Sequence, residues 1–438
     1  MEKIKMTEWQ KIKLGDICDV VGGGTPSTKV DDYWNGNIPW LTPKDLSGYS
    51  NRYISKGERS ITEKGLQNSS AKMLPKGTVL LTSRAPIGYV AIANNDVCTN
   101  QGFKSIVLNR ELFSPEFFYY LLKNNIDYVV GMASGSTFAE ISGSQVKNLE
   151  FEVPPLEIQR KIAGILGALD DKIEVLRAQN KTLEQMAQAV FQSWFVDFDI
   201  VRAKAAGLPA ADVCKKYHIT PDIYDLFPSA FSADNLPLGW EKKKLGDEFK
   251  ITMGQSPSGD TYNEEKKGIP FFQGRRDFGF RYPMKRVYCT APTKFAEKGD
   301  VLVSVRAPVG DLNIANFRCC IGRGVAAVRH YTDSTAYTFY HLKNLSRDFD
   351  VFNEDGTVFG CIGKDDFLNL NFISCPQETL LKLLPQLDLF ENKIYENSKQ
   401  IRTLEQTRDT LLPQLLGGKI DVENVSLPSV NDEDILKI

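Results

Sequence analysis

A heptad pattern of apolar residues constrains the fold of this chain more than any other feature. Between Leu156 and Trp194 the pattern repeats in alternating steps of four and three residues, and charged side chains flank it. Its positions are Ile162, Leu166, Leu169, Ile173, Leu176, Asn180, Leu183, Ala187, Val190 and Trp194. This spacing puts one apolar stripe along a helix, and the stripe needs a second helix to cover it. The stretch therefore predicts half of a coiled coil.

A second seam of the same kind lies near the C-terminus, at Leu383, Leu387, Phe390, Ile394, Asn397, Ile401, Leu404, Arg408, Leu411 and Leu415. The connection between the two stretches is long enough for antiparallel pairing, with Ile162 facing Leu415. Asn180 then faces Asn397, and because a polar core layer fixes register, we predict that their amides meet. The alternative is that each amide points to solvent on a frayed helix. Arg408 interrupts the seam and indicates a loosened coil or a contact with a partner.

The rest of the chain is duplicated as well. Motifs recur in the same order: W-x4-L-G-D from Trp9 and Trp240, R-A-P-[IV]-G from Arg84 and Arg306, [ST]-x-F from Ser136 and Thr357, and a proline before each seam at Pro155 and Pro376. A chain of 438 residues is also too long for one ordinary core. We therefore predict an α+β fold in which a globular domain followed by a long helix occurs twice.

The expected boundaries follow from these motifs. They are a globular domain at 1–155, a coil helix at 156–196, a linker with one short helix at 197–236, a second globular domain at 237–376, a second coil helix at 377–417 and a mobile tail at 418–438. Strands are predicted at 79–82, 89–93, 104–108, 301–305, 312–315 and 325–329. A helix is predicted at 115–124 with Ser114 as its N-cap, and its counterpart at about 337–344.

Composition excludes several classes of protein. The net charge is −2, so attraction to nucleic acid would have to come from a local basic patch. The first residues contain no apolar segment typical of a signal peptide, and no apolar run reaches the length of a membrane span. Eight cysteines without a C-x-x-C motif, together with three histidines, argue against a zinc site. We expect reduced thiols and no metal.

No catalytic motif is found. The run from Gly22 to Lys29 is rich in glycine but fits neither common phosphate-binding pattern, and Val153-Pro154-Pro155-Leu156 lacks the first residue of an adenine methyltransferase tetrapeptide. No nucleophile elbow and no H-E-x-x-H motif occurs. The sequence predicts a non-catalytic chain.

Cationic and amide side chains on glycine-rich turns are the candidate DNA-binding groups. Arginine can bind guanine through two hydrogen bonds, Asn and Gln can bind adenine, and lysine neutralises phosphate. The candidates are Lys44, Arg84, Lys104, Ser136, Gln273, Arg275, Arg276, Arg306 and Arg323. Between residues 275 and 286, Phe278, Phe280 and Tyr282 are interleaved with further cations, which are Arg281, Lys285 and Arg286. Arg84 and Arg306 recur in both copies, which favours a structural or phosphate-positioning role for that pair.

The chain resembles the specificity subunits of type I restriction–modification enzymes. The resemblance rests on the two W-x4-L-G-D starts, L-P-K-G-T-V-L and S-R-A-P-I-G within 74–88, S-G-S-T-F at 134–138, P-P-L-E-I-Q-R-K-I at 154–162, F-Q-S-W-F-V-D-F-D at 191–199 and L-L-P-Q-L-L-G-G-K-I from Leu411. These motifs extend over nearly the whole chain.

The resemblance implies that each globular domain is a target-recognition domain for one half of a split double-stranded DNA sequence. The coil, about 50 Å long at ~1.5 Å per residue, would separate the domains and bind two modification subunits. Those subunits would bind S-adenosylmethionine, and two restriction subunits would use ATP and Mg²⁺. The chain itself would bind no cofactor and no membrane, and would act in the prokaryotic cytoplasm. Two other interpretations remain: an enzyme with an unrecognised active site, and a coiled-coil scaffold whose globular ends bind protein.

Overall fold

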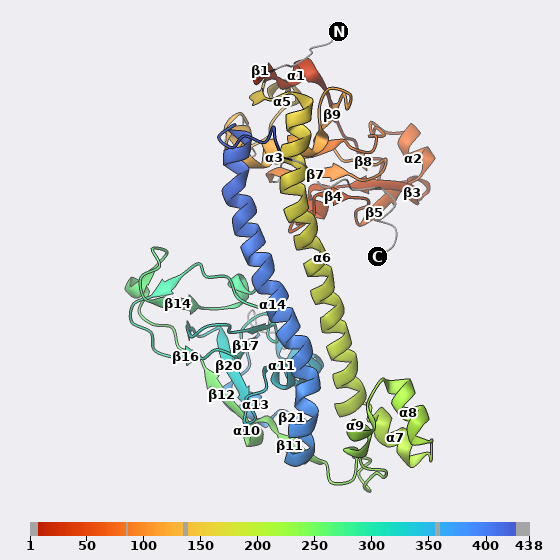
Figure 1. The fold of residues 1–438 in the computed structure, drawn as a ribbon, viewed down its shortest axis with the longest axis vertical. Helices are drawn as coiled ribbons and strands as arrows, with labels where there is room; N and C mark the ends of the chain where they lie inside the picture. The colour runs from red at the N-terminus through yellow and green to blue at the C-terminus, as the bar shows by residue number, and fades with distance from the viewer. Residues whose placement is uncertain (1–7, 85, 135–138, 355–359, 426–438) are drawn as a thin grey trace. The chain divides into compact units, whose positions relative to one another are not determined.

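The chain forms two compact units joined by two long helices. The computed structural model describes residues 8–84, 86–134, 139–354 and 360–425. Unit 1 comprises Met1–Arg177 and Lys399–Ile438, and unit 2 comprises Ala178–Ser398. Both units contain part of α6 (Leu156–Phe195) and part of α14 (Gln377–Leu416), which have 40 residues each (Figure 1). The predicted α+β duplication is confirmed.

In the residues that the structure describes, unit 1 is built on three sheets. The largest has the strand order β2-β9-β6-β7-β4, with bounds Cys18–Gly22, Lys104–Leu108, Val79–Ser83, Ile87–Ala93 and Tyr53–Ile54. A second has the order β5-β3-β8, with bounds Arg59–Ile61, Trp34–Leu41 and Cys98–Thr99. A two-stranded ladder pairs β1 (Gln10–Lys13) with β10 (Glu150–Val153) and closes the domain just before α6.

Unit 2 repeats this plan. Its main sheet has the order β12-β20-β17-β18, with bounds Phe249–Met253, Val325–His330, Val301–Ser304 and Leu312–Ile314. The second sheet has the order β13-β15-β14-β19-β16, with bounds Tyr262–Asn263, Tyr288–Cys289, Ile269–Phe272, Cys319–Ile321 and Phe295–Ala296. The ladder of β11 (Glu241–Lys244) with β21 (Asn371–Ser374) precedes α14. All six strands predicted from the sequence are present within two residues of their predicted ends.

Short helices cover the sheets. Those of unit 1 are α1 (Leu14–Ile17), η1 (Asp31–Tyr33), η2 (Pro43–Leu46), α2 (Glu63–Gln67), α3 (Pro115–Asn124), α4 (Ile126–Gly131) and α5 (Gly143–Lys147). Those of the domain in unit 2 are α10 (Leu245–Glu248), η3 (Gly259–Thr261), η4 (Arg275–Asp277), α11 (Thr335–Asn344), α12 (Ser346–Glu354) and α13 (Lys364–Asn369). Ser114 caps α3 by accepting a hydrogen bond from the Phe117 amide at 3.3 Å, as predicted, and Ser334 caps α11 in the same way.

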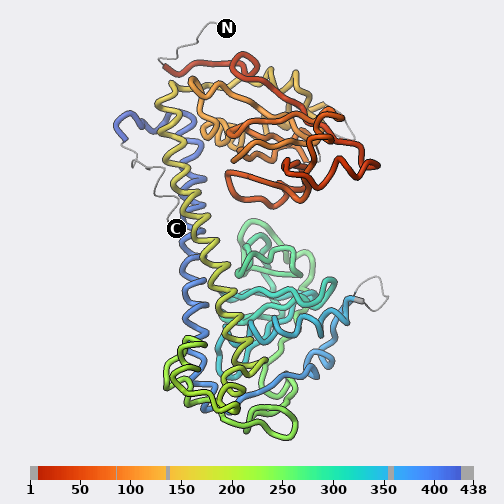
Figure 2. The backbone as a smooth tube through the Cα atoms, turned by 90° about the vertical axis from the view of Figure 1, so that its right-hand side faces the viewer, coloured from red at the N-terminus to blue at the C-terminus, as the bar shows by residue number. Residues whose placement is uncertain are grey.

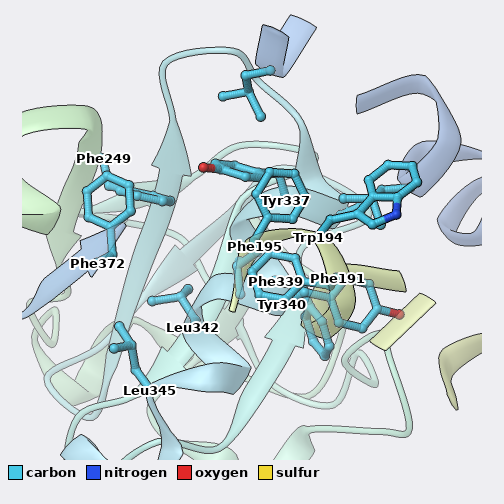
Figure 3. Close-up of a cluster of buried hydrophobic side chains, with 14 of the residues drawn as sticks. Phe191, Trp194, Phe195, Phe249, Tyr337, Phe339, Tyr340, Leu342, Leu345 and Phe372 are labelled. Carbon is cyan, nitrogen blue, oxygen red and sulfur yellow. The ribbon is translucent and has the colours of Figure 1, made fainter. Parts of the chain in front are cut away.

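The core of unit 2 joins its domain to the end of α6. Phe191, Trp194 and Phe195 of α6 gather with Tyr337, Phe339 and Tyr340 of α11 (Figure 3). The ring centroids of Phe195 and Tyr337 are 5.4 Å apart and meet edge to face. Because such aromatic surfaces bury large apolar areas, this cluster stabilises both the domain and its attachment to the helix.

The two long helices pair antiparallel in each unit (Figure 2). In unit 1, Ile162 and Leu415 share one core, as the predicted alignment requires. Arg408, which interrupts the apolar seam, donates to Asp170 on α6 at 2.7 Å. Within unit 1 this ion pair, whose two side chains are only 18% and 14% exposed, fills the interruption of the apolar seam.

Asn180 and Asn397 are both buried in the helix pair of unit 2, and each is 2% exposed. The Asn180 amide donates to Ser398 Oγ at 3.1 Å, so its partner is the residue next to Asn397. Asn180 Oδ1 and Asn397 Nδ2 have no hydrogen-bond partner among the described residues. Asn180 and Asn397 thus lie in one buried layer, but their amides form no hydrogen bond with each other.

The segment after α6 is more ordered than the predicted linker. It contains α7 (Asp199–Ala205), α8 (Ala210–Tyr217) and α9 (Pro221–Asp225), where the sequence suggested one short helix. Ile200, Val201 and Val213 are buried in the core of unit 2. The three helices could not be recognised from the sequence, because each is too short for its apolar residues to show a helical period. Within the described residues, no helix is both long enough and apolar enough to pass through a membrane.

Candidate nucleic-acid interface

Three turns of unit 2, which follow β14, β17 and β19, are tied together by backbone hydrogen bonds. The Gly322 amide donates to the Phe272 carbonyl at 2.9 Å, and the Gly324 amide donates to the Gln273 carbonyl at 3.0 Å. The Val305 amide then donates to the Gly324 carbonyl at 3.0 Å. The predicted residues Gln273, Arg323 and Arg306 therefore lie on adjoining turns.

Glycine permits this close approach. A Cβ atom on Gly324 would lie 2.4 Å from the Gln273 carbonyl oxygen, so any side chain would force the two turns apart. The turn that follows Arg306 ends at Gly310, whose φ is 99°, and its counterpart Gly88 in unit 1 has a φ of 105°. Left-handed φ values favour glycine, which accounts for the repeated R-A-P-[IV]-G motif.

The arginines on these turns point into solvent. Arg275, Arg276, Arg306 and Arg323 are all exposed. Arg275 forms an ion pair with Asp311. Arg276, Arg306 and Arg323 have no carboxylate within ion-pair distance among the described residues. The cluster is thus a local basic patch on a chain whose net charge is −2, and it can attract phosphate or donate to base edges.

Unit 1 arranges its turns in the same way. The Asn100 amide donates to the Leu41 carbonyl at 2.9 Å, and the Ser83 amide donates to the Gly102 carbonyl at 2.7 Å. The turns that carry Lys44, Arg84 and the Asn100–Gly102 segment are therefore adjacent. Lys44 is exposed on η2 and donates to Glu58 at 2.8 Å. The hydrogen bond and the charge of Glu58 raise the pKa of Lys44, which stays protonated.

Arg84 and Lys104 in unit 1 share one carboxylate. Lys104 Nζ lies 3.3 Å from Glu140 Oε1, and Arg84 Nη1 lies 3.7 Å from Glu140 Oε2. Glu140 was not identified from the sequence, although it follows the S-G-S-T-F motif closely. Ser136, another predicted site residue, lies outside the described residues.

One interpretation from the sequence is wrong. Arg281 stands between Phe280 and Tyr282, and was included with the cations of a DNA-binding turn. In the structure its side chain is fully buried, with Glu184 and Glu391 at 3.8 and 3.7 Å and the Phe339 ring 4.0 Å away. It holds the domain of unit 2 to α6 and α14 and is not available to DNA. Arg286 is also occupied, because it donates to Asp277 at 2.8 Å.

Within the described residues, no three His, Cys, Asp or Glu side chains are grouped as a metal site. The polar groups of both clusters are mainly cations and amides, with the carboxylates of Glu58, Glu140 and Asp311 paired to some of them, on turns that backbone hydrogen bonds hold in place. Such an arrangement can bind a polyanion and can discriminate hydrogen-bonding edges.

Comparison with known proteins agrees with this geometry. The family model described as the type I restriction modification DNA specificity domain matches residues 6–185 and 237–405, so it matches each copy separately. The chain is 36% identical over 437 residues to the MjaIX specificity subunit of Methanocaldococcus jannaschii, and the alignment covers 95% of both chains. It is 25% identical to the HindI specificity subunit of Haemophilus influenzae, over 95% of this chain and 100% of that one.

A solved structure shares the fold. The S subunit of a type I restriction–modification system from M. genitalium aligns with a TM-score of 0.56 and 17% identity, over 95% of this chain and 97% of that one. The predicted resemblance is confirmed by the family model and by these relatives.

Proposed function

The chain belongs to the family of type I restriction–modification specificity subunits, and from that premise we propose that each of its units reads one half of a bipartite DNA target. The family function is DNA sequence recognition by a non-catalytic subunit. One observation supports the assignment of one half-site to each unit. Both units contain the same set of adjoining turns, but these turns carry different side chains.

The difference between the two sets supports separate half-sites. The turn after β3 carries Lys44, whereas the matching turn after β14 carries Arg275 and Arg276. The turn before β9 carries Gln101, whereas the turn before β20 carries Arg323. Conserved backbone geometry with divergent polar side chains suits two readers of two different sequences, because base contacts specify and phosphate contacts position.

Lys44, Arg84, Lys104 and Ser136 are our candidates for contacts with the first half-site. Gln273, Arg275, Arg276, Arg306 and Arg323 are the candidates for the second. Asn180 and Asn397 would fix the register of the helix pair, because a buried polar layer disfavours shifted alignments.

The helices α6 and α14 would set the spacing between the half-sites. They would also bind two modification subunits, which methylate adenine with S-adenosylmethionine. Two restriction subunits would add ATP- and Mg²⁺-dependent cleavage. In this assembly the present chain would recognise the target sequence and would bind no cofactor. Its partner subunits would carry out methylation and cleavage.

The direct experiment is to co-express this chain with the modification subunit encoded beside it, in a host without adenine methylation, and to map N6-methyladenine by sequencing. A motif with two defined halves and a fixed gap is the expected result. A one-part motif would contradict the assignment of one half-site to each unit. If the complex forms and no motif appears, the proposed recognition is refuted.

Salt dependence separates DNA binding from a protein-binding scaffold. Binding of the complex to target duplex should weaken by orders of magnitude between about 50 and 200 mM salt, because phosphate contacts release counterions. Incubation of the chain alone with S-adenosylmethionine and DNA tests for enzymatic activity, and no methyl transfer is expected.

A further inference from the structure

Among the residues that the structure describes, Glu140 is the one carboxylate that contacts two of the candidate DNA-binding cations of unit 1. Its Oε1 lies 3.3 Å from Lys104 Nζ and its Oε2 lies 3.7 Å from Arg84 Nη1. Its side chain is 40% exposed, whereas that of Lys104 is 17% exposed. The carboxylate therefore faces solvent at the surface where the proposed function puts DNA.

The backbone holds Glu140 firmly in this place. Glu140 and Ser134 exchange two backbone hydrogen bonds, each 3.1 Å long. The following amide, of Ile141, donates to the Ser83 carbonyl at 3.0 Å, and the Ser83 amide donates to the Gly102 carbonyl. The main chain of Glu140 is thus fixed relative to both turns that flank it, and the contacts with Arg84 and Lys104 orient the carboxylate, as a base-reading group requires.

Unit 2 lacks this arrangement, although one of these backbone hydrogen bonds is repeated there. Cys361 forms an antiparallel β-bridge with Arg306, and the Ile362 amide donates to the Val305 carbonyl at 3.2 Å. The latter bond matches that of the Ile141 amide to Ser83, so Cys361 stands where Glu140 stands in unit 1. Ala326 is the counterpart of Lys104, because it lies opposite Met253 in the β12–β20 pair as Lys104 lies opposite Gly22 in the β2–β9 pair. The fold therefore forms without the carboxylate and without the lysine.

A carboxylate on a DNA-binding surface is repelled by phosphates, so it weakens binding unless it has a partner. Arg84 and Lys104 offset its charge and leave a net positive group of three side chains. Their contacts also leave carboxylate lone pairs directed to solvent, since ionised Glu can accept about four hydrogen bonds. In the major groove, the donors on base edges are the exocyclic amino groups N4 of cytosine and N6 of adenine.

We propose that Glu140 is a specificity-determining residue that accepts a hydrogen bond from the exocyclic amino group of one base in the first half-site. This inference rests on the proposed function and names a residue that unit 2 does not duplicate. Arg84 and Lys104 act as positioning residues, because they orient the carboxylate and allow it to approach the DNA.

The test uses the complete modification complex and compares wild type, Glu140→Ala, Glu140→Gln and Glu58→Ala. Glu58→Ala is the matched control, since it likewise removes an exposed carboxylate that pairs with a candidate lysine of unit 1, here Lys44 at 2.8 Å. Mapping N6-methyladenine should show that Glu140→Ala relaxes the preference at one base pair of one half-site about ten-fold or more. The other half should be unchanged, Glu140→Gln should keep part of the preference, and Glu58→Ala should keep all of it.

Base analogues then test the amino group itself. At the relaxed position, a duplex with purine in place of adenine, or 2-pyrimidinone in place of cytosine, lacks that group alone. Wild type should bind the analogue duplex about ten-fold more weakly than its natural target, and Glu140→Ala should bind the two equally. The analogue that produces this loss identifies the base.

Other outcomes would overturn the inference. Uniform loss of methylation at every position, or equal loss with the analogue in wild type and in Glu140→Ala, would show that Glu140 is a counterion for Arg84 and Lys104 and reads no base. If wild type yields a two-part motif and Glu140→Ala leaves every position within about two-fold, the assignment of Glu140 fails alone. If wild type yields no two-part motif, the proposed function fails.

Discussion

Arg281 Nε lies 3.7 Å from Glu391 Oε1, and the arginine side chain is fully buried in unit 2. The same connection exists in unit 1, where Arg52 Nη2 lies 2.7 Å from Asp171 Oδ1. The backbone carbonyl of each arginine also accepts a hydrogen bond from a strand: the Ile314 amide donates to Arg281, and the Ile92 amide donates to Arg52. Each globular domain is therefore attached to its helix by an equivalent buried arginine.

We expect Arg281→Met to destabilise unit 2 by about 3–5 kcal/mol, because removing one partner leaves a buried charge without compensation. Burial raises the pKa of Glu391, and Arg281 opposes that shift. Urea unfolding of the complete chain measures the effect. Arg281→Met combined with Glu391→Leu should recover part of the loss.

Arg318→Ala is the matched control for this prediction. Arg318 pairs with Glu297 at 3.1 Å, but both side chains are more than half exposed, so the change should be within about 1 kcal/mol. Equal effects of Arg281→Met and Arg318→Ala would show that the buried connection contributes no more than a surface pair.

The misassignment of Arg281 shows where sequence reasoning stops. A cation between aromatic residues has the same local pattern whether it stacks on a base or is buried beside a carboxylate. The deciding partner, Glu391, lies more than a hundred residues away along the chain. The distinction depends on tertiary packing, which no local pattern contains.

The buried amides of the helix pair permit a second prediction. Asn180→Leu with Asn397→Leu should raise the thermal unfolding midpoint, because Asn180 Oδ1 and Asn397 Nδ2 are buried without partners among the described residues. Each such group costs about 1–3 kcal/mol. Asn180→Leu alone should gain less, since it leaves the Asn397 amide unpaired. A lower midpoint in the double variant would show that the amides satisfy each other in solution.

The exposed arginines of unit 2 should act on one half-site. Arg276→Ala is expected to relax one position of the second half by about 1–3 kcal/mol and to leave the first half intact. Arg275→Ala should have a smaller effect, because Arg275 is already paired with Asp311. Methylation mapping measures both, with Arg318→Ala as the control. Equal loss at both halves would indicate a phosphate contact or misfolding.

The stability of unit 2 should depend on pH through His341. Burial lowers the pKa of His341 to about 3, and His330 beside it adds to the shift. The folded state therefore keeps the imidazole neutral, whereas the unfolded chain binds a proton below about 6.5. Stability is complete above that pH and is lost as the pH falls from about 6.5 toward 3.

For His341 we predict a loss of about 2 kcal/mol between pH 7.5 and pH 5, measured by urea unfolding. His341→Phe keeps an aromatic ring beside Phe191, 4.7 Å away, and should reduce the dependence on pH. Exposed His218 lies outside this cluster, so His218→Asn should retain it. An unchanged slope in His341→Phe would assign the effect to other groups.

Features that depend on regular spacing along the chain could be predicted from the sequence. Groups of side chains that the fold brings together from distant segments could not. The seam from Ile162 to Trp194 and the helix capped by Ser114 depend on spacing alone, and the structure has both. The grouping of Arg306, Arg323 and Gln273 depends on hydrogen bonds between turns that are distant in sequence. Duplicated motifs marked these turns, but no pattern revealed that Glu140 would join Arg84 to Lys104.

The central claim is that each unit reads one half-site and that α6 and α14 set the distance between the two half-sites. Deleting one heptad from each helix tests it most directly. Removing residues 172–178 and 399–405 takes one heptad from each helix, keeps the seam in phase and removes Arg177 together with its partner Glu405. Seven residues at ~1.5 Å each shorten the helix pair by about 10 Å, or roughly three base pairs of DNA. Methylation mapping should return both half-sites unchanged with a gap shorter by about that amount. An unchanged gap with full methylation would contradict the spacing role of the coil.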